Sequence, residues 1–169
     1  MNEKIYKYRF SRRVWGYSLL YVVGLSLLAV ALYYLYEGGY LSAWFSSCIL
    51  ALLLLMALSI PRKIRLSDER LRVDCLMDMT EIPLEEILSV RRLDKREMRG
   101  VIPLLGCFGF FGYYGYYLDV VQVEMVRLYA SEWDHFVEIT DIYENRLIIS
   151  SPQADELVAE LQSRIGNRP

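Results

Sequence analysis

Histidine and cysteine, on which many metal sites and nucleophilic enzymes depend, are scarce in this chain of 169 residues. The single histidine is His135, and the spacing of histidine and cysteine offers no cluster of metal ligands. The cysteines are Cys48, Cys75 and Cys107, an odd number without close pairs, which argues against a disulfide framework. We therefore expect no metal ion and no cofactor.

Charged residues are missing from a long stretch in the first part of the chain. Between Val14 and Ile60 the single charge is Glu37, whereas residues 62–169 carry 14 basic and 19 acidic residues. An uncharged stretch of this length exceeds what the core helix of a soluble protein needs, so a purely soluble globule is excluded. The acidic balance of residues 62–169 also argues against a nucleic-acid partner.

Two uncharged runs, at about 14–36 and 40–60, have the length of membrane-spanning helices. At about 1.5 Å per helical residue, each is long enough to cross a hydrocarbon core about 30 Å thick. The link between them is too short for anything but an antiparallel turn, so residues 14–61 are predicted to form a transmembrane hairpin. Because the runs contain no aspartate, glutamate, lysine, arginine or histidine, a transporter or an intramembrane protease is disfavoured.

Basic residues flank the predicted hairpin at both ends and are absent from its connecting turn. They are Lys4, Lys7, Arg9, Arg12 and Arg13 before it, and Arg62, Lys63 and Arg65 after it. The positive-inside rule then places both termini in the cytoplasm, with residues 1–13 as a basic cytoplasmic segment. We expect a multi-pass protein of the inner cell membrane whose residues 62–169 form a cytoplasmic domain.

The first part of that domain, residues 63–74, has the alternation of a β-hairpin. The alternation pairs Ile64 with Val73 on the core face. In the same register, Arg65 stands opposite Arg72 on the polar face.

Further strand-like runs and one helix complete the predicted domain. The runs lie at 82–90, 120–130, 136–142 and 147–150, with a turn at 143–146. Ser151 is the expected N-cap of the final helix, and Pro152 its first residue. The predicted fold class is thus a transmembrane hairpin followed by an α+β domain, mainly antiparallel β, in which a bent sheet or small barrel is closed by a C-terminal helix.

Four segments resemble the bacterial pleckstrin-homology-like (PH-like) domains that follow a pair of membrane helices. They are residues 82–87 (IPLEEI), 106–115 (GCFGFFGYYG), 128–131 (LYAS) and 149–152 (ISSP), whose doubled serine departs from the expected Ile-Ser-Pro. The resemblance covers about residues 62–165. It implies a seven-stranded barrel with a C-terminal helix and no catalytic role, and it supplies no site residues.

The glycine and aromatic residues of 106–115 allow three interpretations. The rings fill the core while the glycines stand where backbones crowd, or they form an exposed loop that docks on lipid or protein. In the third interpretation, the uncharged stretch 100–118 is a further membrane span. A phosphate-binding loop is excluded, because no Lys-Ser/Thr follows.

A basic run at 91–99 directly precedes this block, a combination that suits an anionic leaflet. Arg65 and Arg72 lie close to the end of the second predicted span and extend the same patch. The candidate membrane or partner contacts are Arg65, Arg72, Arg91, Arg92, Lys95, Arg96, Arg99, Phe110, Phe111, Tyr113 and Tyr114. The alternative is a solvated loop with internal ion pairs.

These features predict a membrane-anchored, non-catalytic binding or scaffolding module with no catalytic residue. Its expected partners are the lipid bilayer and either another membrane protein or a second copy of the chain. Two alternatives remain: an accessory subunit of an envelope enzyme complex, and a hydrolase in which Cys107 pairs with His135.

Overall fold

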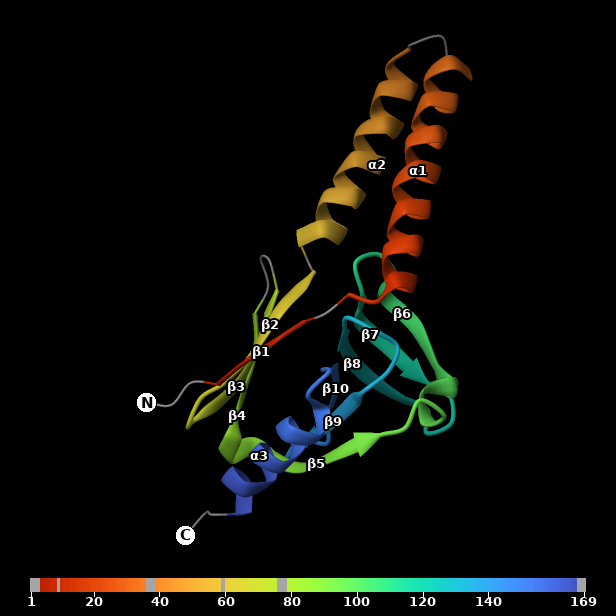
Figure 1. Cartoon of the computed structure of the whole chain (residues 1–169). Helices are drawn as coiled ribbons and strands as arrows, with labels where there is room; N and C mark the ends of the chain where they lie inside the picture. The colour runs from red at the N-terminus through yellow and green to blue at the C-terminus, as the bar shows by residue number, and fades with distance from the viewer. Residues whose placement is uncertain (1–3, 9, 36–38, 59, 76–78, 167–169) are drawn as a thin grey trace.

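The computed structural model of the chain describes residues 4–8, 10–35, 39–58, 60–75 and 79–166. Two long helices project together from one end of a domain that consists of two β-sheets and a C-terminal helix (Figure 1). This confirms the prediction of an apolar N-terminal helix followed by a mainly antiparallel β domain that ends in a helix.

The projecting helices are α1 (Arg12–Leu35) and α2 (Tyr40–Leu58). They pack against each other (Figure 1), and apolar side chains along both are exposed. In the described part of the chain, α1 alone is long and apolar enough to cross a membrane, and a shorter apolar segment, Ala43–Leu55, lies within α2. The turn predicted between the two helices lies mostly outside the described residues.

Four antiparallel strands form the first sheet, in the order β1-β2-β3-β4. They are β1 (Lys4–Lys7), β2 (Pro61–Leu66), β3 (Arg70–Cys75) and β4 (Met79–Pro83). The first strand corrects the expectation that residues 1–13 are only a basic segment, because β1 pairs with β2 and extends the sheet.

The register between β2 and β3 confirms the predicted hairpin. Ile64 lies opposite Val73, and Arg65 lies opposite Arg72. Ser67 closes the turn, since its N–H donates to the carbonyl oxygen three residues later at 3.0 Å. The period of two places Ile64 and Val73 on the inner face, where both are buried.

Six strands form the second sheet, in the order β5-β9-β10-β8-β7-β6. They are β5 (Ile87–Leu93), β6 (Val101–Phe108), β7 (Tyr113–Asp119), β8 (Glu124–Ala130), β9 (Phe136–Asp141) and β10 (Arg146–Ser150). Neighbouring strands are antiparallel except β8 and β10, which are parallel. The two sheets are separate within the described residues, so a closed barrel stays a prediction.

Two parts of the sequence prediction differ from the structure. The strand predicted at 82–90 is two strands in different sheets, because a 3-10 turn, η1 (Leu84–Glu86), separates β4 from β5. The third membrane span considered at 100–118 is wrong, because those residues form most of the antiparallel β6–β7 pair. A second 3-10 turn, η2 (Glu97–Gly100), leads into β6.

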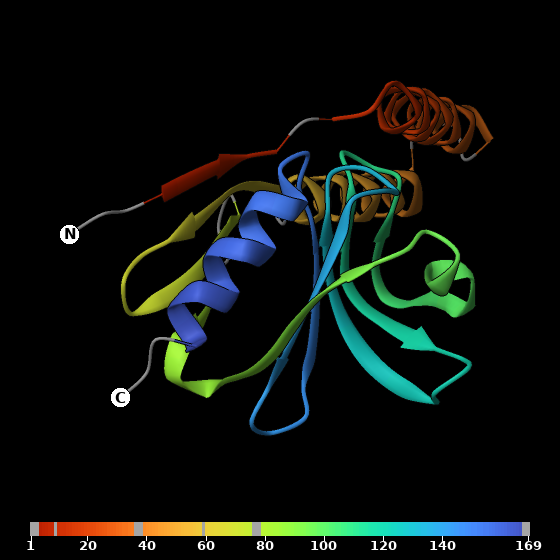
Figure 2. The same cartoon turned by 60° about the horizontal axis from the view of Figure 1, so that its bottom comes forward.

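The last helix, α3 (Ala154–Gly166), lies on the side of the domain away from α1 and α2 and packs against β5 (Figure 2). The helix begins two residues later than predicted, because Pro152 and Gln153 form a turn before Ala154, and in that turn the hydroxyl of Ser151 accepts the N–H of Gln153 at 3.2 Å. Leu157 and Leu161 are fully buried, so one face of α3 closes the core.

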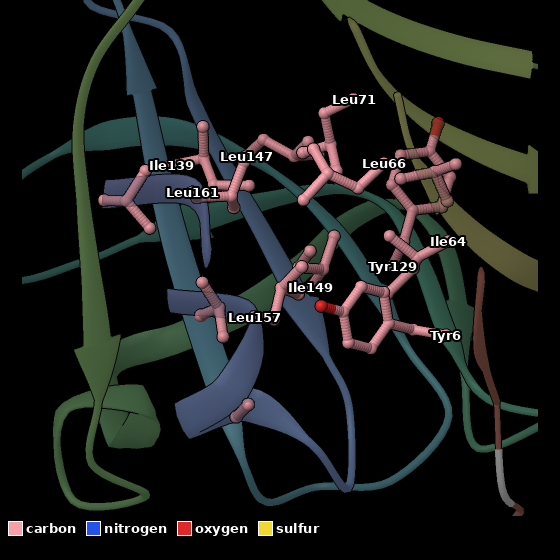
Figure 3. Close-up of a cluster of buried hydrophobic side chains, with 14 of the residues drawn as sticks. Tyr6, Ile64, Leu66, Leu71, Tyr129, Ile139, Leu147, Ile149, Leu157 and Leu161 are labelled. Carbon is pink, nitrogen blue, oxygen red and sulfur yellow. The ribbon is translucent and has the colours of Figure 1, made fainter. Parts of the chain in front are cut away.

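The core brings together side chains from before and after the helical hairpin. Tyr6 from β1 lies with Ile64 from β2, Leu71 from β3, Ile149 from β10 and Leu157 from α3 (Figure 3). Each is at most 1% exposed, and burying an aliphatic or aromatic side chain of this size stabilises a fold by about 1.5–3 kcal/mol. The domain core therefore includes residues on both sides of α1 and α2.

Candidate functional site

The tip of the β6–β7 hairpin packs against the first turns of α1, and we take this junction as the candidate functional site. The buried hydroxyl of Ser18 donates to the carbonyl oxygen of Val14 at 2.7 Å and accepts the N–H of Phe111 at 2.7 Å. Ser18 lies less than two turns after Arg12, the first residue of α1. Farther along, the hydroxyl of Tyr21 donates to the carbonyl oxygen of Phe108 at 3.3 Å. A hydroxyl within an apolar helix thus fastens the hairpin tip to α1.

Two glycines allow the hairpin tip to approach its neighbours closely. Gly109 has φ +92°, and a Cβ there would lie 3.0 Å from the Cβ of Tyr17 on α1. Gly112 has φ +128°, and a Cβ there would lie 2.7 Å from the carbonyl oxygen of Ala130 on β8. This backbone region favours glycine, so the glycine spacing at the tip reflects close packing on both sides.

Aromatic rings of the tip face α1 and the segment before it. The ring of Phe111 makes edge contacts with Phe10 and Trp15, at centroid distances of 6.3 and 5.5 Å. The ring of Phe110 makes an edge contact with Tyr21 at 6.3 Å. Edge-to-face pairs of this kind add about 0.5–1.5 kcal/mol beyond their buried area, so the tip and α1 form one packed unit.

The predicted aromatic contacts are mostly interior residues. Phe110, Tyr113 and Tyr114 are buried, whereas Phe111 is partly exposed. Burial, together with a hydrogen bond to the Cys107 thiol, raises the pKa of Tyr114 and keeps its hydroxyl neutral. The interpretation in which the rings fill the core therefore applies to Phe110, Tyr113 and Tyr114. For Phe111, contact with a membrane or a partner stays a prediction.

The facing arginines of the first sheet have acidic neighbours. Nε of Arg65 lies 2.5 Å from Oδ2 of Asp74. Arg72 pairs with Glu81 on β4. These ion pairs offset the repulsion expected between Arg65 and Arg72. Contact of either arginine with an anionic leaflet stays a prediction.

The basic run 91–99 is divided between paired and unpaired side chains. Nη1 of Arg91 lies 3.0 Å from Oε2 of Glu97, and Arg92 pairs with Asp155 of α3. The others, Lys95, Arg96 and Arg99, are exposed and have no ion-pair partner in the part of the chain that the structure describes. The structure does not gather the whole run into one patch, and its contact with lipid stays a prediction.

A buried ion-pair network, which the sequence did not indicate, joins strands β7, β9 and β10 of the second sheet. The side chain of Arg146 is 10% exposed and lies 2.5 Å from Glu138 and 3.1 Å from Asp119. Burial opposes the charge of Arg146, but the hydrogen bonds and charges of Glu138 and Asp119 together outweigh burial and raise the pKa of the guanidinium. Such fully partnered charges hold β7, β9 and β10 in register.

Cys107 and His135, the two residues of the alternative hydrolase, form hydrogen bonds with different side chains. The Cys107 thiol bonds with Tyr114, and the His135 ring bonds with Glu132. Burial raises the pKa of the Cys107 thiol, which disfavours the thiolate needed for nucleophilic attack. Nδ1 of His135 lies 2.9 Å from Oε1 of Glu132. Among the described residues there is no group of histidine, cysteine and acidic side chains arranged to hold a metal ion.

A family model for the bacterial PH domain matches residues 62–165. No curated protein and no solved structure matches the chain. The match begins after α2, so it leaves out β1 although that strand belongs to the first sheet.

Proposed function

The chain belongs to the bacterial PH domain family, and we propose that it is a membrane-anchored, non-catalytic binding and scaffolding module. A PH-like domain supports a binding role, and the apolar, exposed surfaces of α1 and α2 support an anchor. The observation that carries the proposal is the insertion of both helices between two neighbouring strands, β1 and β2.

The insertion joins the anchor tightly to the domain. In β1, Lys4 lies opposite Leu66 and Tyr6 opposite Ile64 of β2. Nζ of Lys4 also lies 2.8 Å from Oε1 of Glu156 on α3. An anchor that leaves and re-enters a domain through paired strands fixes the orientation of that domain, whereas a single flexible linker would let it swing.

The same pairing supports the proposed topology. Because β1 and β2 are neighbours, the two ends of the helical hairpin emerge on the same side of any membrane that α1 and α2 cross. The basic residues at both ends favour the cytoplasmic side. We therefore assign α2 as the second span of a multi-pass inner-membrane protein, with both termini and the domain in the cytoplasm.

A second candidate function, an accessory subunit of a larger membrane complex, is favoured by the edge strand β6. Ile102, Leu104 and Leu105 are 48%, 58% and 72% exposed on this strand, and among the described residues β6 pairs with another strand on one side alone. Exposed apolar edge strands readily pair with another chain. The occupant we assign to this edge is a membrane protein that lies beside α1.

The full-length chain tests both parts of the proposal. Anchoring predicts that the protein stays in membranes washed with alkaline carbonate, and its release would contradict an anchor. Partner binding predicts that Leu104→Asp abolishes co-purification of a stoichiometric membrane protein after detergent extraction. The matched control is Leu88→Asp, since Leu88 is 63% exposed on the opposite edge strand β5. Equal recovery of the partner with both variants would contradict a β6 interface.

A further inference from the structure

A cavity of about 310 Å³ lies beside the beginning of α1, and nothing in the proposed function uses it. Its lining comes from the start of α1, the segment after β5, the facing ends of β6 and β7, and the β8–β9 loop. Segments far apart in the sequence therefore meet at the point where the helical hairpin joins the domain (Figure 1).

One wall of the cavity is aromatic and rigid. The ring of Trp133 lies 4.7 Å from that of Tyr113 and 5.4 Å from that of Phe108. Phe108 and Tyr113 themselves pack edge to face at 5.0 Å. Three rings that hold one another in place form a surface that requires little ordering when a ligand binds.

The charged side chains of the lining are two cations and two carboxylates. Arg13 and Lys95 are exposed and have no ion-pair partner among the described residues. Oε1 of Glu132 lies 2.9 Å from Nδ1 of the His135 ring, and Oδ1 of Asp134 accepts the backbone N–H of His135 at 2.9 Å. The lining is thus neutral in sum and carries both signs.

The position of Arg13 relates the cavity to the bilayer. Arg13 directly precedes the apolar part of α1, and Tyr17, one turn farther along, also lines the cavity. In a protein anchored as proposed above, this is the depth of lipid headgroups, where arginine, lysine and aromatic rings are favoured.

We propose that this cavity binds the headgroup of a phospholipid that carries an ammonium group, as ethanolamine lipids do. Arg13 and Lys95 bind the phosphate. The ammonium group lies between the carboxylates of Glu132 and Asp134 and against the face of Trp133. A purely anionic headgroup fits less well, because the two carboxylates repel it. This inference rests on the proposed membrane anchoring, which carbonate washing tests independently of lipid identity.

Binding is measured by native mass spectrometry of the full-length protein in detergent, titrated with phosphatidylethanolamine or with phosphatidylglycerol of the same acyl chains. We expect tighter binding of phosphatidylethanolamine, and roughly tenfold weaker binding or more in the Arg13→Gln, Lys95→Gln double variant. The control is the Arg96→Gln, Arg99→Gln double variant, which removes the same charge from exposed residues outside the cavity. It should bind like the wild type.

A second variant tests the ammonium subsite. In the Glu132→Gln, Asp134→Asn double variant, the side-chain oxygens that contact His135 remain, while the two negative charges are removed. This variant should lose the preference for phosphatidylethanolamine over phosphatidylglycerol and keep the thermal stability of the wild type. Equal binding of the two lipids by the wild type, or unchanged binding in the Arg13/Lys95 variant, would overturn the proposal. Displacement of lipid by soluble glycerophosphoethanolamine would overturn the assignment to a membrane lipid.

Discussion

Tyr6 and Ile64 lie opposite each other in neighbouring antiparallel strands, although the entire helical hairpin separates them in the sequence. Both side chains are 1% exposed. Their pairing means that α1, α2 and the PH-like domain share one folding unit. The domain is incomplete without residues that precede α1.

Tyr6→Ala should destabilise the whole domain, because it removes a large ring from the core. Truncating a buried aromatic side chain costs about 3–5 kcal/mol. We expect a lower midpoint in thermal unfolding of the full-length protein in detergent, followed by the circular dichroism of the sheets. Tyr143→Ala is the control, since Tyr143 is 67% exposed, and its midpoint should not change. Equal midpoints of the two variants would show that β1 adds nothing to the core.

Ser18→Ala should loosen the hairpin tip without unfolding the domain. The change leaves the partly buried N–H of Phe111 without its acceptor, which costs about 1 kcal/mol. Hydrogen exchange at the amides of residues 109–112 should accelerate, while exchange in β9 and β10 stays slow. Ser26→Ala, at an exposed position on α1, should leave exchange at the tip unchanged. Slow exchange at the tip in Ser18→Ala would contradict the proposed fastening.

Glu138→Ala should be strongly destabilising, because it leaves Arg146 buried with less than its full set of partners. Removing one member of a buried ion pair costs about 3–5 kcal/mol. Glu124→Ala removes an exposed partner of the same arginine and should cost less than about 1 kcal/mol. Denaturant unfolding of both variants measures the difference, and similar losses would contradict a buried network.

The pH dependence of stability should depend in part on Asp119. Burial opposes ionisation of this carboxyl, but the hydrogen bond and charge of Arg146, together with the backbone N–H groups of Val121 and Gln122, outweigh burial and hold the pKa of Asp119 below its ordinary value of 3.8. A lowered pKa in the folded state stabilises the protein above the ordinary pKa, and this contribution is lost as the pH falls through the lowered value.

Unfolding free energies of the wild type and Asp119→Asn, measured between about pH 7 and pH 3, test this directly. The variant should be less stable near neutral pH, and the difference should shrink toward pH 3. A constant difference across the range would show that the Asp119 charge makes no contribution.

The alternation of apolar and polar residues was enough to predict the β2–β3 hairpin to the residue. Ile64 opposite Val73 follows from the period of two together with a short turn. The approximate positions of α1, α2 and α3 followed similarly from uninterrupted apolar runs and from the expected cap at Ser151.

The first strand and the break at η1 were not predicted, for different reasons. Tyr6, Tyr8 and Phe10 alternate with basic residues, as a strand requires, but the basic residues of that segment indicated only membrane topology. The break after Pro83 depends on tertiary packing, which sends β4 and β5 into different sheets. The role of Ser18 could not be predicted, because nothing in the sequence distinguishes it from other serines in an apolar helix. Its role follows from its hydrogen bond with Phe111, which the structure shows.

The membrane topology of the full-length chain shows whether both ends of the helical hairpin return to the same domain. Reporter proteins that are active on one side of the membrane are fused before residue 1, within the turn at residue 39, and after residue 169 of the full-length chain. We predict cytoplasmic signals at both ends and an external signal at residue 39. Signals from opposite sides at the two ends would contradict the account, because β1 and β2 could not then pair within one domain.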